Sequence, residues 1–508
     1  MGLLVLLAAY TVTLLLAFTI ATLHRSMQSK RTSATALNKP APPGPAGYPL
    51  LGSLLYVIGP LRHNPHRSLV ALAKAHGPIV YLRLGLTRAM AVVSSAAVAH
   101  EALVKNDAAL AARLVPDNVR ALSYGATSMV FLPSSDQLWR QLRVLIGAGF
   151  SSSRIRPVLE RRAGQLAEHV RACAGSGRPV NIREAVNGTV LNVVSNVLFS
   201  EDVVDLREQQ KAQTFKSLVV PVLEEWSKPS VSDAFPFLAP LEHLLGSRRR
   251  ISTHLAKLFR FFDEVIIEKR LACGEKHNDI LDVLLSRMAM AKLTRQQITT
   301  FLTDMFIAAS DTSTVTVQWA MAELLRHPEK MKKVNAELAE KLGSTDFVTE
   351  SDLSELPYLH AVVKETLRLH PAVPLIPREV VADDMSLGGF HVPKGTGVIV
   401  NLWAIGRDES AWPRAEEFIP ERFLAGQEVH SSMVKEAYRP FGAGRRVCPG
   451  MEYTARSVPL LLASILHRNE WRLPDGDGIG LEGMDLHDRY GTVLNPATPL
   501  HAVLVSTV

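Results

Sequence analysis

Cysteine is scarce in this chain. Among 508 residues only Cys173, Cys273 and Cys448 are cysteines, and none belongs to a C-x-x-C pair. This scarcity excludes a disulfide framework and a cysteine-rich zinc site. It also indicates a reducing compartment that faces the cytosol. Low-complexity tracts are missing too, and 47% hydrophobic with 21% charged residues indicate a packed globular chain, not a collagen or a disordered scaffold.

A strong excess of one charge is also missing. The net charge is +7, from 56 Lys and Arg against 49 Asp and Glu, and the two signs are interleaved along the chain. A dedicated nucleic-acid-binding protein is therefore not expected. A basic patch for an acidic protein partner or an anionic membrane fits this composition better.

A long uncharged run opens the chain. Residues 2–23 carry no charged side chain, and at about 1.5 Å per residue a helix of this length crosses a bilayer core of roughly 30 Å. Four basic residues follow it: Arg25, Lys30, Arg31 and Lys39. The positive-inside rule then places the rest of the chain in the cytosol. The sequence thus predicts an uncleaved transmembrane signal anchor over residues 1–24.

A proline-rich segment comes next. Residues 40–49 read PAPPGPAGYP, a composition typical of extended polyproline-type backbone. We therefore expect residues 25–49 to form a basic and proline-rich hinge. Because no comparable linker and no repeat follow, residues 50–508 are expected to form one large domain.

The body is predicted to be mainly α with minor β. Residues 136–370 place apolar side chains mostly three and four apart, which indicates a long helical region. Alternation over residues 79–84 and 90–93 predicts a hairpin. Further strands are expected at residues 398–400 and near the C-terminus. The run Arg248–Arg250 is interpreted as a solvated loop without function.

One cysteine lies in an unusual loop. Residues 441–450 read FGAGRRVCPG, so glycines that tolerate positive φ surround Cys448 and allow a flat ligand to approach the backbone. Backbone N–H groups in such a turn can point at a thiolate and tune it. A single cysteine cannot hold structural zinc, but it can be the axial thiolate of a haem iron. From the residues alone, an inert buried cysteine and a nucleophile remain open.

This loop resembles the haem-binding signature of the cytochrome P-450 family, F-x-x-G-x-R-x-C-x-G. Every fixed position is matched: Phe441, Gly444, Arg446, Cys448 and Gly450. The family's other markers follow in order, so the resemblance covers essentially the whole chain. It implies a single large P-450 fold behind the transmembrane helix, haem b with Cys448 as the metal ligand, and Arg446 paired with a haem propionate.

The second marker is Glu365-Thr366-Leu367-Arg368. Residues three apart share a helix face, so Glu365 and Arg368 can pair. An exposed pair of this kind would contribute only about 0–1 kcal/mol. The resemblance implies the buried case, completed by Arg422 of Pro420-Glu421-Arg422-Phe423, and therefore a structural network that retains the haem.

The third marker lies in a helix expected from about Thr294 to His327. Residues 308–313 read AASDTS and resemble the oxygen-activation motif A/G-G-x-D/E-T-T/S. The resemblance implies that Thr312 acts on bound oxygen and that Asp311 relays protons from solvent. Ala309 stands where glycine is usual, which adds one methyl group to the oxygen groove. From the residues alone, an ordinary polar helix face remains open.

Further matches concern the propionates and the electron source. Trp139 and Arg143 form W-x-x-x-R, and Arg378 ends Leu375-Ile376-Pro377-Arg378; the resemblance places all three at the haem propionates, with a surface arginine as the ordinary alternative. Because no nicotinamide fingerprint and no flavin domain is present, we expect electrons from NADPH through the membrane-bound NADPH–cytochrome reductase. Candidate basic contacts for its acidic face are Arg140, Lys435, Arg439 and Arg445.

The resemblance also indicates a substrate class. Residues 233–238, 356–359 and 374–378 are similar to the geraniol-hydroxylase-like branch of plant microsomal A-type enzymes. That similarity implies a monooxygenase of the endoplasmic reticulum membrane that oxidises a hydrophobic small molecule, most specifically a labdane-related diterpenoid of plant defence. The expected pocket walls are residues 115–124, Phe306, Ala309, residues 373–376 and Thr492-Val493.

Several alternatives remain at this stage. Within the same class they are a flavonoid or phenolic hydroxylase, a monoterpene alcohol hydroxylase, and a non-redox isomerase, against which the retained Thr312 argues. A haem-binding carrier without turnover is the rival from a different class. A secreted protein with a cleaved signal would expose the Asn187-Gly188-Thr189 sequon to glycosylation.

Overall fold

A computed structural model of the chain describes residues 39–59, 63–85, 87–175, 178–204, 209–228, 230–240, 242, 246–425, 432–474 and 486–507. The expected anchor over residues 1–24 and most of the expected hinge lie outside the described residues. Among the helices that the structure does describe, none has both the length and the apolar composition that a bilayer crossing requires.

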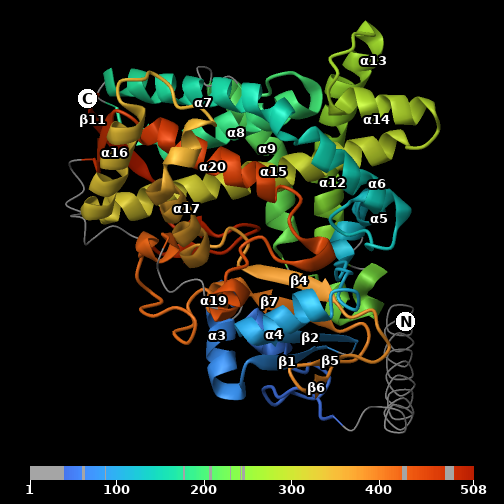
Figure 1. The fold of residues 1–508 in the computed structure, drawn as a ribbon. Coiled ribbons are helices and arrows are strands. Elements are labelled where there is room, and N and C mark those ends of the chain that lie inside the picture. The colour runs from blue at the N-terminus through green and yellow to red at the C-terminus, as the bar shows by residue number, and fades with distance from the viewer. Residues whose placement is uncertain are drawn as a thin grey trace, which may run out of the picture.

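A four-stranded sheet lies beneath a larger helical body (Figure 1). The expected hairpin is confirmed: β1 (Ile79–Leu84) pairs antiparallel with β2 (Arg88–Val93). β7 (Gly397–Asn401) runs parallel to β2, and β4 (Leu375–Glu379) is antiparallel to β7. The spatial order β1-β2-β7-β4 therefore brings segments about 300 residues apart in sequence into one sheet. Near the C-terminus β11 (His501–Thr507) joins a second sheet, as expected.

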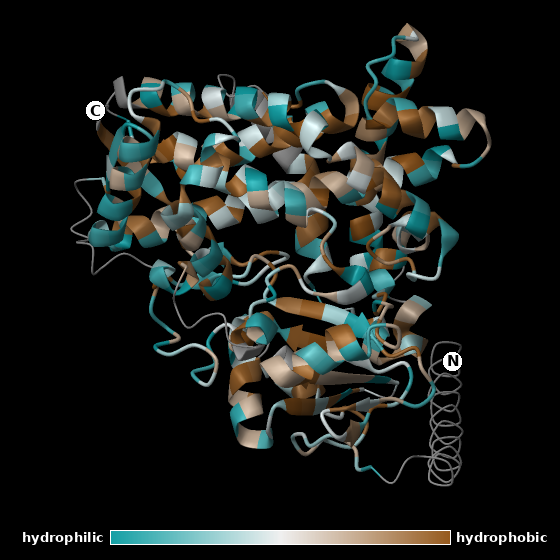
Figure 2. Cartoon of the chain, viewed as in Figure 1, coloured by the Kyte–Doolittle hydropathy of each residue, from teal (hydrophilic) through white to brown (hydrophobic). Residues whose placement is uncertain are grey.

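The helical body confirms the predicted mainly α class. Its longer helices are α6 (Gln137–Gly149), α7 (Ser152–Gly175), α8 (Ile182–Phe199), α9 (Gln209–Trp226), α12 (Ser247–Arg260), α14 (Ile280–Ala289), α15 (Arg295–Arg326), α16 (Pro328–Leu342), α17 (Pro357–Leu369) and α20 (Met451–Leu466). Outer helices such as α16 carry mostly hydrophilic colours in Figure 2, whereas apolar colours gather on the inner helices and on the sheet.

The solvated loop expected at Arg248–Arg250 is wrong. These residues form the first turn of α12, and two of the three reach carboxylates on neighbouring segments. Arg248 Nη1 lies 3.2 Å from Asp117, and Arg250 Nε lies 3.0 Å from Glu225. The charge run is therefore used for tertiary contacts, because the fold brings acidic side chains within reach that are distant in the sequence.

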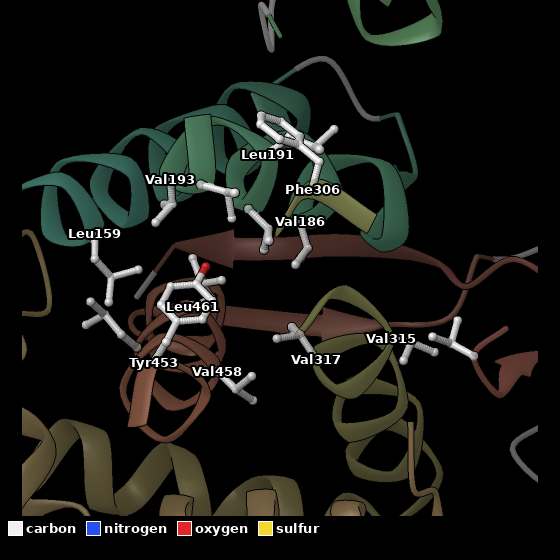
Figure 3. Close-up of a cluster of buried hydrophobic side chains, with 14 of the residues drawn as sticks. Leu159, Val186, Leu191, Val193, Phe306, Val315, Val317, Tyr453, Val458 and Leu461 are labelled. Atoms are coloured by element: carbon white, nitrogen blue, oxygen red, sulfur yellow. The ribbon is translucent and has the colours of Figure 1, made fainter. Parts of the chain in front are cut away.

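α15 organises the core. It begins with a capping box in which Thr294 and Gln297 satisfy each other's backbone N–H groups, and it runs for 32 residues. Figure 3 shows side chains from α7, α8, α15 and α20 meeting in one apolar cluster, among them Val186, Phe306 and Leu461. Because α15 passes through this core, both of its faces contact other elements along most of its length.

Phe306 illustrates the tightness of that core and corrects an expectation. Its ring is fully buried, stacked on Phe199 at 5.7 Å and tilted against Phe262 at 5.2 Å. The expected pocket-wall position of Phe306 is therefore wrong, since the side chain fills the core instead.

Candidate active site

The cysteine loop is closed by a backbone hydrogen bond. The N–H of Cys448 donates to the carbonyl oxygen of Phe441 at 3.0 Å, so the segment 441–448 folds back on itself just before α20. Gly442 and Gly444 have φ of 71° and 72°, in the left-handed region that favours glycine. A Cβ at Gly444 would also collide with Asp107 and with the Leu103 backbone. Gly444, a fixed position of the signature, is therefore required by the geometry of this turn, and Gly442 by its positive φ.

Opposing effects act on the Cys448 sulfur. Burial raises the pKa of its thiol, because a charged sulfur is poorly solvated there. The backbone N–H of Gly450 and the positive charges of Arg143 and Arg113 act in the opposite direction. A metal cation bound at the sulfur would reverse the balance outright, since metal coordination deprotonates a thiol. The loop thus offers one shielded sulfur with donors already directed at it.

Three of the expected haem contacts lie together above this loop. Arg446 is held by backbone carbonyls: Nε donates to Ala111 at 2.6 Å, Nη1 donates to Val130 at 3.2 Å, and Nη2 donates to Leu132. Its guanidinium carbon lies 5.4 Å from the centre of the Trp139 ring, and that of Arg143 lies 5.8 Å from the same ring. Trp139, Arg143 and Arg446 therefore form one cluster, although they come from α6 and the cysteine loop.

Arg378 extends this cluster from the sheet. Burial, together with the positive charges of Arg113 and Arg446, lowers the pKa of Arg378 to about 9. Burial likewise lowers the pKa of Arg446 to about 10, with Arg113 and Arg143 as the next contributions. Such mutual repulsion is costly unless an anion joins the cluster.

Arg113 is the member that sequence reasoning missed. Its Nη1 donates to the Val130 carbonyl at 3.0 Å, while its buried Nε has no hydrogen-bond partner among the described residues. In the sequence it is one arginine in Ala-Ala-Arg-Leu-Val, a context without any local signal. Only the fold, which bonds Arg113 and Arg446 to the same carbonyl, reveals its place.

The residues present fit a haem group. Within the part of the chain that the structure describes, none of the four guanidiniums of Arg113, Arg143, Arg378 and Arg446 forms an ion pair with a carboxylate. A flat ligand with two carboxylates and a thiophilic metal would satisfy the cationic cluster and the shielded sulfur together. The orphaned Nε of Arg113 is the donor that such a carboxylate would bind.

The Glu365–Arg368–Arg422 network is present as expected. Arg368 donates to Glu365 through Nε at 2.7 Å and Nη2 at 2.8 Å, and Arg422 Nε donates to the same carboxylate at 3.2 Å. The remaining Arg368 donors bind backbone carbonyls of Ala415, at 2.7 Å, and Glu417, at 2.9 Å. All three charged side chains are buried. The network therefore ties α17 to the irregular segment that precedes the cysteine loop.

The middle of α15 borders an open space. Every residue from Ile298 to Phe306 and from Ser313 to Leu325 is buried, yet Ala308 between them is exposed. Thr312 lies on this stretch, and its hydroxyl donates to the Ala308 carbonyl at 2.9 Å. This is the local bond that a mid-helix threonine can make. The hydroxyl oxygen can still accept a hydrogen bond from the open side.

Asp311 has a partner that its neighbours in sequence do not suggest. Arg183 donates to Asp311 through Nη2 at 2.9 Å and to the side chain of Asn495 through Nη1. The Asp311 carboxylate is thus linked through α8 to the segment that contains the expected wall residues Thr492 and Val493.

Sequence reasoning also missed Asp304 of α15, which anchors the expected pocket wall at residues 115–124. The buried Asp304 carboxylate accepts hydrogen bonds from the Ser128 hydroxyl and the Met129 N–H, each at 2.8 Å, and from the Tyr124 hydroxyl. Burial raises the pKa of Asp304 to about 6, against the effect of these donors. The 115–124 segment is therefore fastened to α15 two helical turns before Thr312.

A shielded cysteine sulfur and a cluster of arginines beside one long continuous helix are the features that a haem-thiolate protein would need. Residues 42–493 match the family model for cytochrome P-450, so the chain belongs to that family and is a cytochrome P-450 monooxygenase with a haem-thiolate cofactor. The chain is 42% identical to oryzalexin E synthase of Oryza sativa subsp. japonica, covering 96% of each protein.

Two further relatives place the chain within the family. It is 41% identical to ent-cassadiene C11-alpha-hydroxylase 1 of Oryza sativa subsp. japonica, over 92% of this chain and 93% of that protein. It is 40% identical to geraniol 8-hydroxylase of Catharanthus roseus, over 92% and 94%. The chain therefore belongs to the 76 family of plant cytochromes P-450, and the expected similarity to the geraniol-hydroxylase-like branch is confirmed.

Proposed function

We propose that this monooxygenase oxidises a terpenoid, most specifically a labdane-related diterpenoid of plant defence, at the endoplasmic reticulum membrane. The observation that carries the proposal is the combination of an intact haem-thiolate site with relatives of about 40% identity named for diterpenoid and geraniol oxidation. The reaction consumes the substrate R–H, O2, NADPH and a proton, and yields R–OH, water and NADP+.

The site residues divide this work. Haem held by Cys448 supplies reductive activation of dioxygen and insertion of one oxygen atom into a C–H bond. We assign Arg446, Arg378 and Arg143, with Trp139 between two of them, to binding the propionates. Phe441, Gly444 and Gly450 shape the loop that presents the sulfur.

The α15 window holds the proton-handling groups. We assign Thr312 to accept a hydrogen bond through its hydroxyl oxygen on the open side of the helix, with Asp311 supplying protons from solvent. The 2.9 Å bond from Thr312 to the Ala308 carbonyl fixes the hydroxyl oxygen at the exposed stretch. The ion pair with Arg183 holds the Asp311 carboxylate near the protein surface. Rotation of either side chain would therefore expose that carboxylate to water.

Aliphatic walls suit a hydrocarbon skeleton. The expected walls present half-buried or exposed aliphatic side chains, namely Val115, Ala309, Val373 and Leu375, whereas the Tyr124 ring is buried and packs 5.0 Å from Trp226. A site lined in this way with few polar groups favours a large apolar ligand over a charged one. Geraniol is a monoterpene alcohol, so a smaller terpenoid alcohol is the second candidate substrate.

Membrane attachment is proposed from two features. The first is the uncharged run before residue 24. The second is a set of exposed apolar side chains on two adjoining segments: Tyr48, Leu50, Leu55, Val231 and Phe237. These segments adjoin because Gly52 pairs with Leu84 and Gly85 packs against the Ala234 backbone. Deletion of residues 1–24 should weaken membrane association and leave haem binding intact; loss of haem would show that the segment belongs to the fold.

A P-450 enzyme of this kind requires a reductase, and the docking face is a proposal. Arg140 and Lys435 are exposed, and exposed Arg445 of the cysteine loop pairs with Asp107 at 3.2 Å. Arg439 is half-buried and bonds His100 at 2.9 Å, so it contributes less to an exposed patch. We assign the first three to the acidic face of NADPH–cytochrome reductase.

Co-expression with a plant reductase tests the substrate class. The panel contains geraniol, several labdane-related diterpenes with oxygenated derivatives, and flavonoids, with products identified by mass spectrometry. An oxygenated diterpene product would support the proposal. Turnover of geraniol alone would favour the second candidate, and turnover of flavonoids alone would overturn the terpenoid assignment.

A further inference from the structure

Two of the expected pocket walls are joined directly to each other. The N–H of Leu494 donates to the carbonyl oxygen of Ala372 at 2.9 Å. Ala372 lies between α17 and β4, the strand that carries Arg378 of the arginine cluster. The 373–376 wall therefore leads directly to the arginine cluster. Leu494, which follows the expected wall residues Thr492 and Val493, is attached at the start of that wall.

Trp319 of α15 holds this junction from the other side. Its indole N–H donates to the carbonyl oxygen of Leu494 at 2.8 Å, and the whole side chain is buried. Both backbone groups of Leu494 are thus satisfied, one by each neighbour. A buried backbone carbonyl left without a donor is costly, so this bond fixes the distance between α15 and Leu494, next to the expected wall residues Thr492 and Val493.

The orientation of the Trp319 ring is fixed by a histidine of the other wall. His370 directly follows α17, two residues before Ala372, and its ring stacks on Trp319 at 3.9 Å with an interplanar angle of 5°. His370 Nε2 lies 2.6 Å from a carboxylate oxygen of Glu323, which is one helical turn beyond Trp319 on α15. Trp319 and Glu323 of α15 therefore both contact His370, which lies just before the 373–376 wall.

We propose that Trp319, supported by His370 and Glu323, is a positioning residue that sets the relative placement of the two walls and so selects which carbon of the substrate is oxidised. The inference rests on the proposed function, because residues 373–376 and Thr492-Val493 are the walls expected for the substrate pocket of that function. Trp319 itself is too deeply buried to touch the substrate, so it acts through Leu494 and Ala372.

The physical basis is the sensitivity of oxidation site to small displacements. A misplacement of about 1 Å can change a rate by roughly a hundredfold when the reacting atoms must align. The carbons of a terpenoid skeleton that compete for oxidation lie only one or a few bonds apart. A shift of one wall by a few tenths of a bond length therefore changes the product ratio before it abolishes turnover.

The test replaces the indole without removing the ring. Trp319→Phe keeps an aromatic partner for His370 but loses the N–H bond to Leu494. Trp471→Phe is the matched control, because Trp471 in β8 (Asn469–Arg472) also loses one indole bond, to the Ile465 carbonyl at 3.0 Å, away from both walls. Haem incorporation in each variant is checked by the carbon monoxide spectrum of the reduced enzyme.

Two readouts separate the inference from the proposed function. Hydrogen exchange in the holoenzyme, followed on peptides covering 370–376 and 490–496, should rise roughly tenfold at both walls in Trp319→Phe, as expected for one lost buried hydrogen bond, and stay unchanged in the control. With a terpenoid that the wild type oxidises, the ratio of regioisomeric products should shift several-fold in Trp319→Phe only.

Unchanged exchange, or faster exchange with an unchanged product ratio, overturns the inference. If the wild type oxidises no terpenoid, the proposed substrate class fails while hydrogen exchange still judges whether Trp319 joins the two walls. Should Trp319→Phe fail to bind haem, His370→Phe replaces it. That variant keeps a ring against Trp319, loses the contact with Glu323, and should shift both readouts in the same direction.

Discussion

Glu365 and Arg368 form a two-pronged ion pair, with bonds of 2.7 and 2.8 Å, in a site where neither side chain is more than 3% exposed. Arg422 brings a second positive charge to the same carboxylate, and backbone carbonyls take up the remaining guanidinium donors. In this part of the described structure, Glu365 is thus the only carboxylate that contacts two buried guanidinium groups. The network of Glu365, Arg368 and Arg422 therefore depends on the negative charge of Glu365.

Replacing Glu365 with glutamine should therefore destabilise the enzyme strongly. The substitution keeps the shape of the side chain but leaves both arginines without a counter-charge, and breaking a buried pair costs roughly 3–5 kcal/mol. The thermal unfolding midpoint and the haem content per protein should both fall. Arg414→Ala is the control, because Arg414 and Glu417 are an exposed pair whose loss costs about 1 kcal/mol or less. Equal effects of the two substitutions would contradict a buried structural role.

The spacing of the sequence was sufficient to predict this network but not its surroundings. Glu365 and Arg368 lie on one turn of α17, so their pairing follows from helical periodicity, and the resemblance supplied Arg422. The backbone acceptors at Ala415 and Glu417 lie in irregular chain, where no periodic pattern indicates a contact. The helical region over 136–370 and the early hairpin were predictable for the same reason, since both depend on local repeats of apolar side chains.

Side chains that act at a distance in sequence were not predictable. Arg113 joins the arginine cluster only because Val130 offers one carbonyl to both Arg113 and Arg446. Arg248 appeared to belong to a solvated charge run, yet it meets Asp117 across 131 residues of sequence. Phe306 was assigned to the pocket wall, but its direction around α15 is set by Phe199 and Phe262. In each case the deciding partner comes from another element.

Cys448 should be indispensable for the thiolate-type spectrum. Replacement with alanine removes the sulfur that the Gly450 N–H and Arg143 act upon, and the carbon monoxide spectrum of the reduced enzyme should lose its thiolate character completely. Cys273 is exposed and serves as the matched control. A thiolate-type spectrum retained in Cys448→Ala would overturn the ligand assignment, whereas loss in Cys273→Ala would point to general damage.

Thr312 should govern how efficiently electrons reach the product. Thr312→Ala removes the hydroxyl at the open stretch of α15, so NADPH consumption should continue while a larger share of electrons appears as hydrogen peroxide and product yield falls several-fold. Thr316→Ala is matched to it, because Thr316 makes the equivalent bond, 2.8 Å to the Thr312 carbonyl, but is buried. Peroxide and product are measured per NADPH oxidised. Unchanged coupling in Thr312→Ala would remove its proposed role.

Asp304 should make the stability of the holoenzyme depend on pH in mildly acidic solution. Burial raises its pKa to about 6, above the ordinary aspartate value of about 3.9. The folded state therefore holds this proton more tightly than the unfolded state. The stability contributed by the protonated group is complete below about pH 4 and is lost as the pH rises to about 6, at up to ~1.4 kcal/mol per pH unit.

Asp304→Asn removes the titration and keeps the Oδ1 acceptor for Tyr124 and Ser128. Its amide nitrogen replaces the oxygen that accepts the Met129 N–H, and that loss changes the stability equally at every pH. Between pH 4.5 and 6 the free energy of unfolding of the wild type should therefore fall by up to ~1.4 kcal/mol more per pH unit than that of the variant. The thermal unfolding midpoint of the wild type should accordingly fall more steeply as the pH rises. Asp346→Asn changes an exposed carboxylate and should reproduce the wild-type slope. The same slope in Asp304→Asn and wild type would mean that the carboxyl of Asp304 titrates normally, and that the 124–129 segment is fastened to α15 by hydrogen bonds whose strength does not depend on the charge of Asp304.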